Sequence, residues 1–164
     1  MKNLWAAWRR DFILGPKEKG CVFCGRIRSR SDRENMILYR GRKNLVIMNI
    51  YPYNGGHLLA MPYAHKCDIN RLTTLESHEL FDLSRKSIEI LKRVMPADGF
   101  NLGMNLGAIA GAGIEEHLHM HIVPRFKGDT SFTAIFGGVK VQSISLCEIY
   151  DMLKPHFNRL KGKS

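Results

Sequence analysis

Residues 116–125 of this chain read EHLHMHIVPR and place histidines at alternate positions, His117, His119 and His121. In a β-strand, alternate side chains point to the same face. The pattern therefore predicts a strand with three imidazoles on one face and apolar side chains on the other. Three imidazoles add nothing to packing that threonine or valine would not do better, whereas their nitrogens ligate metals, attack phosphorus or donate to anionic oxygens. We interpret the histidine face as part of a functional site and the opposite face as core.

The sequence around this segment predicts an α+β domain. Short apolar runs split by turn residues indicate an antiparallel meander at about residues 36–39, 44–49 and 57–61, and another strand at 100–106 before the histidine strand. Apolar side chains spaced by three and four predict a long amphipathic helix over 74–95, with Thr73 or Thr74 as its N-cap. A second helix is expected over about 145–160, and a basic loop over 26–33.

Composition is that of an ordinary globular protein. The chain has 164 residues, 45% hydrophobic and 24% charged, which excludes disordered and collagen-like classes and predicts one domain over 1–164. The formal net charge of +10 suggests an anionic partner such as a nucleotide or a nucleic acid, or a generally basic host proteome. Charge alone does not choose among these partners.

The chain shows no run of about 20 apolar residues and no signal-like opening, since Arg9, Arg10 and Asp11 interrupt its start. We therefore expect a cytoplasmic protein without membrane contact. The N-terminal segment around Trp5 and Trp8 is expected to pack onto the domain or onto a partner subunit. In a reducing compartment, a close cysteine pair such as Cys21-Val-Phe-Cys24 more often binds metal or does redox chemistry than forms a structural disulfide.

A loop of small residues, GAIAGAG at 107–113, precedes the histidine strand. Glycines lack Cβ atoms, so backbone N–H groups there can approach an anion closely, as in phosphate-binding loops. Taken alone, the run is equally consistent with a flexible turn. Its position directly before three histidines favours a phosphate-binding role.

Residues 117–123 fit the signature His-φ-His-φ-His-φ-φ, where φ is apolar. Further elements agree in order with the same family: Cys21-x-x-Cys24, the stretch NIYPYNGGH at 49–57, Pro62-x-x-His65 and Asn105-Leu-Gly-Ala. Over about residues 21–132 the chain resembles the histidine triad family. The resemblance implies a five-stranded antiparallel sheet with a long helix and a C-terminal helix, usually in a homodimer, and cleavage or transfer at the α-phosphate of a nucleotide.

Within that family, the stretch from Asn105 to Phe132 is similar to the bacterial diadenosine tetraphosphate phosphorylases. It departs at Phe126 and Ser131, where that branch usually has Trp and Asn. The resemblance implies a dinucleoside polyphosphate and inorganic phosphate as substrates. Hydrolysis of nucleoside phosphoramidates or of dinucleoside polyphosphates by water is the alternative within the family.

The resemblance also implies residue roles. His119 would be the nucleophile that forms a covalent nucleotidyl-histidine intermediate, with the proton on its other nitrogen held by a hydrogen bond. His121 would donate to a phosphate oxygen or to the leaving group. The phosphates would be held by Asn105 and the backbone near Gly111 and Gly113, and the ribose by Asn49. His57 would support the pocket or the catalytic strand.

In zinc-carrying members of the family, the first histidine of the triad joins the cysteine pair. The resemblance thus implies a tetrahedral, structural zinc site at Cys21, Cys24, His65 and His117, closed because four protein ligands leave no position for substrate. Reduced cysteines that merely pack are the alternative.

Two rival functional classes are consistent with parts of the sequence. A non-catalytic nucleotide- or nucleic-acid-binding protein would fit the charge, but all three triad histidines are present and no aromatic platform for single strands is evident. A zinc-ribbon regulator would need two metal-binding pairs, and one Cys-x-x-Cys pair is present.

Overall fold

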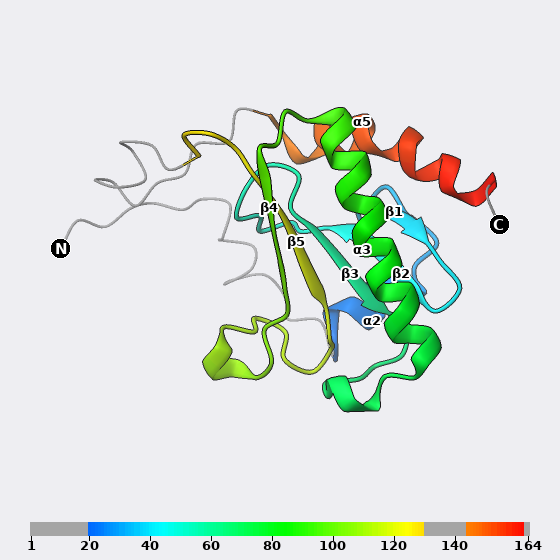
Figure 1. The fold of residues 1–164 in the computed structure, drawn as a ribbon. Coiled ribbons are helices and arrows are strands. Elements are labelled where there is room, and N and C mark those ends of the chain that lie inside the picture. The colour runs from blue at the N-terminus through cyan, green and yellow to red at the C-terminus, as the bar shows by residue number, and fades with distance from the viewer. Residues whose placement is uncertain (1–19, 130–143, 163–164) are drawn as a thin grey trace.

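The computed structural model describes residues 20–129 and 144–162. In this part of the chain, five antiparallel strands form one sheet in the order β1-β2-β3-β5-β4 (Figure 1). The strands are β1 (Ile37–Arg40), β2 (Asn44–Met48), β3 (Leu58–Pro62), β4 (Gly99–Gly103) and β5 (Met120–Arg125). The predicted α+β class, the five-stranded antiparallel sheet and the meander of its first three strands are confirmed.

One face of the sheet is covered by two helices, α3 (Thr74–Val94) and α5 (Leu146–Asn158) (Figure 1). Helix α5 continues into a 3-10 turn, η4 (Arg159–Gly162). The buried core between sheet and helices contains Leu58 and Ile122 from the strands, Leu91 from α3, and Leu153 and Phe157 from α5. These side chains are less than 1% exposed, so this face is closed to ligands.

Helix α3 begins where its capping box is complete. The Thr73 hydroxyl accepts a hydrogen bond from the Glu76 N–H, and the Glu76 carboxylate accepts one from the Thr73 N–H. Such a reciprocal pair satisfies two of the N–H groups that a helix start leaves without partners. The helix ends at Val94 because Met95 precedes Pro96, and the residue before a proline disfavours the α conformation. The predicted helix over 74–95 is confirmed.

The opposite face of the sheet carries a smaller core and the short helix α2 (Val22–Arg28). Phe23 of this helix is buried against Ile47, Leu59 and Met61. The basic stretch after Cys24 was expected to be a loop, and that expectation is wrong for its first part. Burial of Phe23 holds about two helical turns there, and Arg28 at the end of the helix donates from Nε to the Cys24 carbonyl.

Strand β5 begins at Met120, so His117 and His119 precede the ladder instead of lying inside a strand as expected. Its pairing with β3 starts at Met120, opposite Ala60. Before that point the Leu118 N–H donates to the carbonyl of Lys66, in the loop after β3. The N-terminal segment with Trp5 and Trp8, and the tail from Thr130 to Phe132, lie outside the described residues.

Two 3-10 turns complete the described chain, η2 (Ile69–Arg71) and η3 (Ala108–Ala110). Of the described helices, none is long and apolar enough to cross a membrane.

Candidate functional site

The three triad histidines lie together on the α2 face of the sheet. The Phe23 ring contacts both His117, at 5.6 Å between ring centroids, and His119, at 5.1 Å. The rings of His119 and His121 are 4.9 Å apart. The predicted common face therefore holds for all three, although the strand itself starts at Met120.

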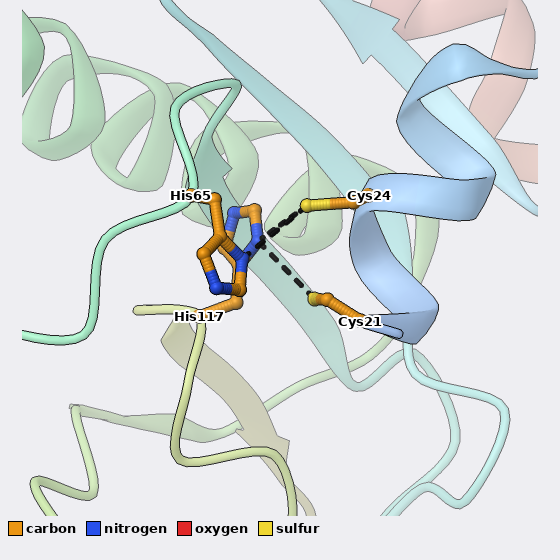
Figure 2. A group of neighbouring side chains, drawn as sticks. All are labelled: Cys21, Cys24, His65 and His117. Carbon is orange, nitrogen blue, oxygen red and sulfur yellow. Dashed lines mark hydrogen bonds between the residues drawn. The ribbon is translucent and has the colours of Figure 1, made fainter. Parts of the chain in front are cut away.

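The first histidine belongs to a cluster of two thiols and two imidazoles. Cys21 and Cys24 come from the start of α2, His65 from the loop after β3, and His117 from the segment before β5 (Figure 2). Their ligand atoms all lie within 4.8 Å of one another. The structure thus brings together all four residues of the predicted metal site from three separate parts of the chain.

The geometry of this cluster fits a tetrahedral metal site. The Nδ1 atom of His117 lies 3.5 Å from Cys21 Sγ and 3.6 Å from Cys24 Sγ, and His65 Nδ1 lies 3.4 Å from Cys24 Sγ. Tetrahedral bonds of about 2.3 Å to sulfur and about 2.0 Å to nitrogen put such atoms about 3.5 Å apart. The ring of His117 is also correctly oriented, because its Nε2–H donates to the Pro62 carbonyl at 2.9 Å and leaves the Nδ1 lone pair facing the thiols.

The middle histidine has its tautomer set by the backbone. His119 Nδ1 lies 2.8 Å from the carbonyl oxygen of His117. Since a carbonyl can only accept, Nδ1 carries the hydrogen and Nε2 keeps its lone pair. This is the hydrogen bond that the nucleophile role requires. The His119 side chain is 7% exposed and lies between Phe23 and His121.

A chain of hydrogen bonds sets the tautomer of the third histidine. The Tyr53 backbone N–H donates to His57 Nδ1 at 3.1 Å, so His57 Nδ1 is an acceptor and a neutral His57 carries its proton on Nε2. That Nε2–H donates to His121 Nδ1 at 2.9 Å. A neutral His121 therefore carries its own proton on Nε2.

Asn49 supports the same chain. Its Oδ1 accepts from the Tyr51 N–H at 2.9 Å, which assigns Nδ2 as the donor to His57 Nδ1 at 3.3 Å. Both amide atoms of Asn49 therefore bond inside the protein, and the predicted ribose contact remains a prediction.

The tight loop before His57 needs Gly56, whose φ is +81° and where a Cβ would lie 2.7 Å from Met95 Sδ.

The Nε2–H of His121 has no hydrogen-bond partner among the described residues and is buried. Burial of a polar group without a partner costs free energy unless a ligand supplies one. Burial also lowers the pKa of His121 to about 4, with a smaller contribution from His119, and lowers the pKa of His57 to about 3, with smaller contributions from His121 and His119. Both rings are neutral at pH 7, as the tautomer assignment requires.

Burial lowers the pKa of His119 as well, partly opposed by its hydrogen bond to the His117 carbonyl. His119 is therefore also neutral at pH 7, with a free lone pair. The site combines a nitrogen lone pair on His119 with a neighbouring unpartnered N–H on His121. Such a pair can attack an electrophilic centre and hold an anionic oxygen beside it.

The glycine loop uses much of its own backbone in internal hydrogen bonds. The Gly111 N–H donates to the Ala108 carbonyl at 2.9 Å, and Asn105 Nδ2 donates to the Gly111 carbonyl at 3.1 Å. Gly111 has φ +88°, a conformation for which glycine is favoured. A Cβ on Gly113 would meet nothing within 4 Å, so that position is open.

A cavity of about 430 Å³ opens beside His121. Asn105 also lines this cavity, whereas His119 is not among the lining residues and is 7% exposed. Sequence reasoning assigned no role to two further lining residues, Tyr53 and Arg125. Tyr53 could have been found as an aromatic residue within the glycine-rich turn before His57, and Arg125 as the charged residue four positions after His121 on the same strand.

Comparison with known proteins identifies the family of the chain. A family model described as the HIT domain matches residues 30–128. An AP-4-A phosphorylase of Mycobacterium tuberculosis is 46% identical over 111 residues, which are 68% of this chain and 57% of the relative, so the match spans a little over half of that protein. An asymmetrical bis(5'-nucleosyl)-tetraphosphatase of Schizosaccharomyces pombe is 32% identical over 97 residues, 59% of this chain and 53% of the relative.

Among solved structures, a zinc-bound histidine triad family protein from Mycobacterium smegmatis superposes with a TM-score of 0.70. The alignment covers 88% of this chain and 98% of that protein at 24% identity, a likeness that establishes the fold. Because the HIT domain model covers most of the chain and the three histidines of the signature share one face, this chain belongs to the HIT, or histidine triad, family.

Proposed function

We propose that this protein is a nucleotidyl transferase or hydrolase that acts at the α-phosphate through His119, and that its preferred reaction is phosphorolysis of a dinucleoside polyphosphate. The observation that carries the proposal is the pair of tautomers, a lone pair on His119 beside an N–H on His121 that has no partner in the described part of the chain. The names of the relatives, a phosphorylase and a tetraphosphatase, favour the polyphosphate substrate.

The reaction follows from these two rings. His119 Nε2 attacks the α-phosphorus, and the bond from that phosphorus to the bridging oxygen breaks, which leaves a nucleotidyl-histidine. His121 Nε2–H donates a hydrogen bond to a phosphate oxygen or to the departing oxygen. Phosphate then attacks the same phosphorus and releases a nucleoside diphosphate, or water releases the monophosphate. Asn105 and the loop at Gly111 and Gly113 would contact the phosphates, and Asn49 the ribose.

The protonation state of His121 favours a phosphate leaving group over an amine. Burial holds the pKa of His121 near 4, so the ring is neutral and offers a hydrogen bond without an acid proton. A polyphosphate departs as an anion, whereas an amine must be protonated as it leaves. Phosphoramidate hydrolysis is therefore the second candidate function.

The Cys21, Cys24, His65 and His117 cluster would hold a structural zinc ion. Bound zinc would keep both thiols deprotonated and tie α2 to the segment before β5. Burial raises the pKa of the Cys21 thiol, so its thiolate needs a cation beside it. His117 would then serve twice, with its ring at the metal and its carbonyl on the Nδ1–H of His119.

We also propose a homodimer. Strand β4 is an edge of the sheet among the described residues, and Leu102 on it and Ile109 beyond it are exposed. An uncovered edge strand with apolar neighbours is a template for pairing with a second chain. Sedimentation of the full chain would test this state.

Product analysis tests the reaction. Diadenosine tetraphosphate is incubated with the full chain, with and without inorganic phosphate, and the nucleotides are separated. Phosphorolysis predicts ADP and ATP that form only with phosphate, and the covalent step predicts an adenylylated peptide containing His119. AMP formed equally well without phosphate would replace phosphorolysis by hydrolysis. No turnover in either case would refute the polyphosphate substrate.

A further inference from the structure

A trough runs along the sheet face from His121 toward the far end of β5. His121, Val123 and Arg125 alternate along β5 and all line the cavity. Four residues of strand extend roughly 13 Å at about 3.3 Å per residue. The trough therefore leads away from the reacting pair for a distance that a small amine does not cover but a chain of several phosphates does.

The near end of the trough is open because β4 has no side chain there. Gly103 pairs directly with His121 in the sheet, and paired residues of antiparallel strands project from the same face. A Cβ on Gly103 would meet nothing within 4 Å, and Gly103 is not among the glycines with positive φ. The absent side chain is thus not required by the backbone, and it leaves open space on β4 opposite His121, where both residues line the cavity.

An aromatic ring forms one side of the same end. The Tyr53 ring lies nearly parallel to that of His121, at 15° and 5.8 Å between centroids, and is 54% exposed.

The far end carries a guanidinium held in a fixed orientation. Arg125 donates from Nε and Nη2 to the two carboxylate oxygens of Asp129, at 2.6 and 2.9 Å, and from Nη1 to Asn101 Oδ1 at 2.9 Å. Within the part of the chain that the structure describes, these three bonds leave two of its five N–H groups available to a ligand. A guanidinium oriented in this way loses little side-chain entropy when it binds an anion.

We propose that this trough is the leaving-group subsite, which takes the distal phosphates and second nucleoside of a dinucleoside polyphosphate, with Gly103 leaving room for the chain and Arg125 and Asn101 binding its far part. The inference rests on the proposed function, because it places the leaving group relative to attack by His119. In this subsite, Gly103 and Arg125 select substrates by the length of the phosphate chain and not by the adenylyl group.

Two substrates with the same adenylyl group separate this subsite from the reaction centre. Diadenosine tetraphosphate has a long leaving group, and adenosine 5′-phosphorofluoridate has a single fluoride. Gly103→Val fills the near end, and Arg125→Gln removes the far cation. Each variant is expected to lower kcat/KM for the tetraphosphate at least ~10-fold relative to kcat/KM for the phosphorofluoridate.

Arg85→Gln is the matched control. It removes an arginine that is likewise paired with carboxylates, Asp82 and Glu89, but lies on α3, across the sheet from the trough. Thermal unfolding of every variant is measured alongside. If Arg125→Gln unfolds because Asp129 loses its ion pair with Arg125, Asn101→Ala tests the far end in its place.

The outcomes distinguish this inference from the proposed function. A selective loss of kcat/KM for the tetraphosphate in both Gly103→Val and Arg125→Gln supports the subsite. Equal losses on both substrates, or no loss on either, in variants that stay folded would overturn it while leaving attack by His119 intact. A wild-type protein that turns over neither substrate would instead refute the proposed function itself.

Discussion

His117 and His121 are the same residue type on the same face of one segment, yet their surroundings prepare them for different chemistry. His117 has its Nε2–H bonded to a carbonyl and its Nδ1 lone pair facing two thiols, so every polar atom of the ring has an assigned neighbour. His121 accepts at Nδ1 from His57, and its buried Nε2–H meets no partner in residues 20–129 and 144–162. The partner of one ring nitrogen therefore decides what the other nitrogen can do.

His119 lies between these two ends, and its replacement should have the largest effect. His119→Ala removes the attacking nitrogen, so turnover of diadenosine tetraphosphate should fall at least ~10³-fold and no nucleotidyl adduct should form. Steady-state kinetics and mass spectrometry of the quenched reaction check this. His78→Ala, at an exposed position on α3, is the control. Retained activity in His119→Ala would refute the proposed nucleophile.

Changes in the cluster around His117 should alter metal content and thermal stability. Cys24→Ser removes one ligand of the proposed zinc site, so metal content should fall and the thermal midpoint should drop by about 10 °C or more. Elemental analysis and calorimetry measure the two quantities. Cys147→Ser changes an exposed cysteine outside the cluster and should change neither. Zinc retained at one ion per chain in Cys24→Ser would contradict the ligand set.

The buried pair of His57 and His121 should make the free energy of unfolding depend on pH. The pKa values of His57 and His121 are about 3 and about 4 in the folded protein, below the unfolded value of 6.5, so the unfolded chain binds protons first as pH falls. The free energy of unfolding should be full above pH 6.5 and decline from there toward pH 3. Since each pKa unit corresponds to about 1.4 kcal/mol, the loss by pH 4 is on the order of several kcal/mol.

Urea unfolding between pH 7 and pH 4 measures this decline, and His57→Asn separates the histidines from other titrating groups. The variant lacks the buried ring with the lower pKa, so its stability should depend less steeply on pH between 6.5 and 4. An unchanged slope would show that the histidine pair is not the source of the acid sensitivity.

The smallest effect is expected on the opposite face of the sheet. Thr73→Ala removes the hydroxyl that accepts the Glu76 N–H, which should lower the free energy of unfolding by ~1 kcal/mol and leave kcat unchanged. Thr74 is exposed and makes no capping contact, so Thr74→Ala should lower the free energy of unfolding by less than Thr73→Ala does. A change in kcat with Thr73→Ala would mean that the two faces are coupled.

Much of this arrangement could be predicted because it follows from local periodicity. The spacing of Leu80, Ser84 and Leu91 reports which side of a helix is buried, and the structure places all three in the buried face of α3. The meander over residues 37–62 also follows from short apolar runs and turn residues. Helix α2 was missed because seven residues carry too little periodicity, and burial of Phe23 by distant strands holds it in place.

The sequence by itself determined the family, the strand and helix pattern, and the set of residues that could act, because each depends on residue type and spacing. Tertiary structure alone decided the protonation pattern. The His117 carbonyl assigns the proton of His119, and the loop containing Tyr53 and His57 assigns that of His121. Tautomers depend on which donor or acceptor meets each nitrogen, and those partners come from residues far along the chain or from backbone groups that carry no signature in the sequence.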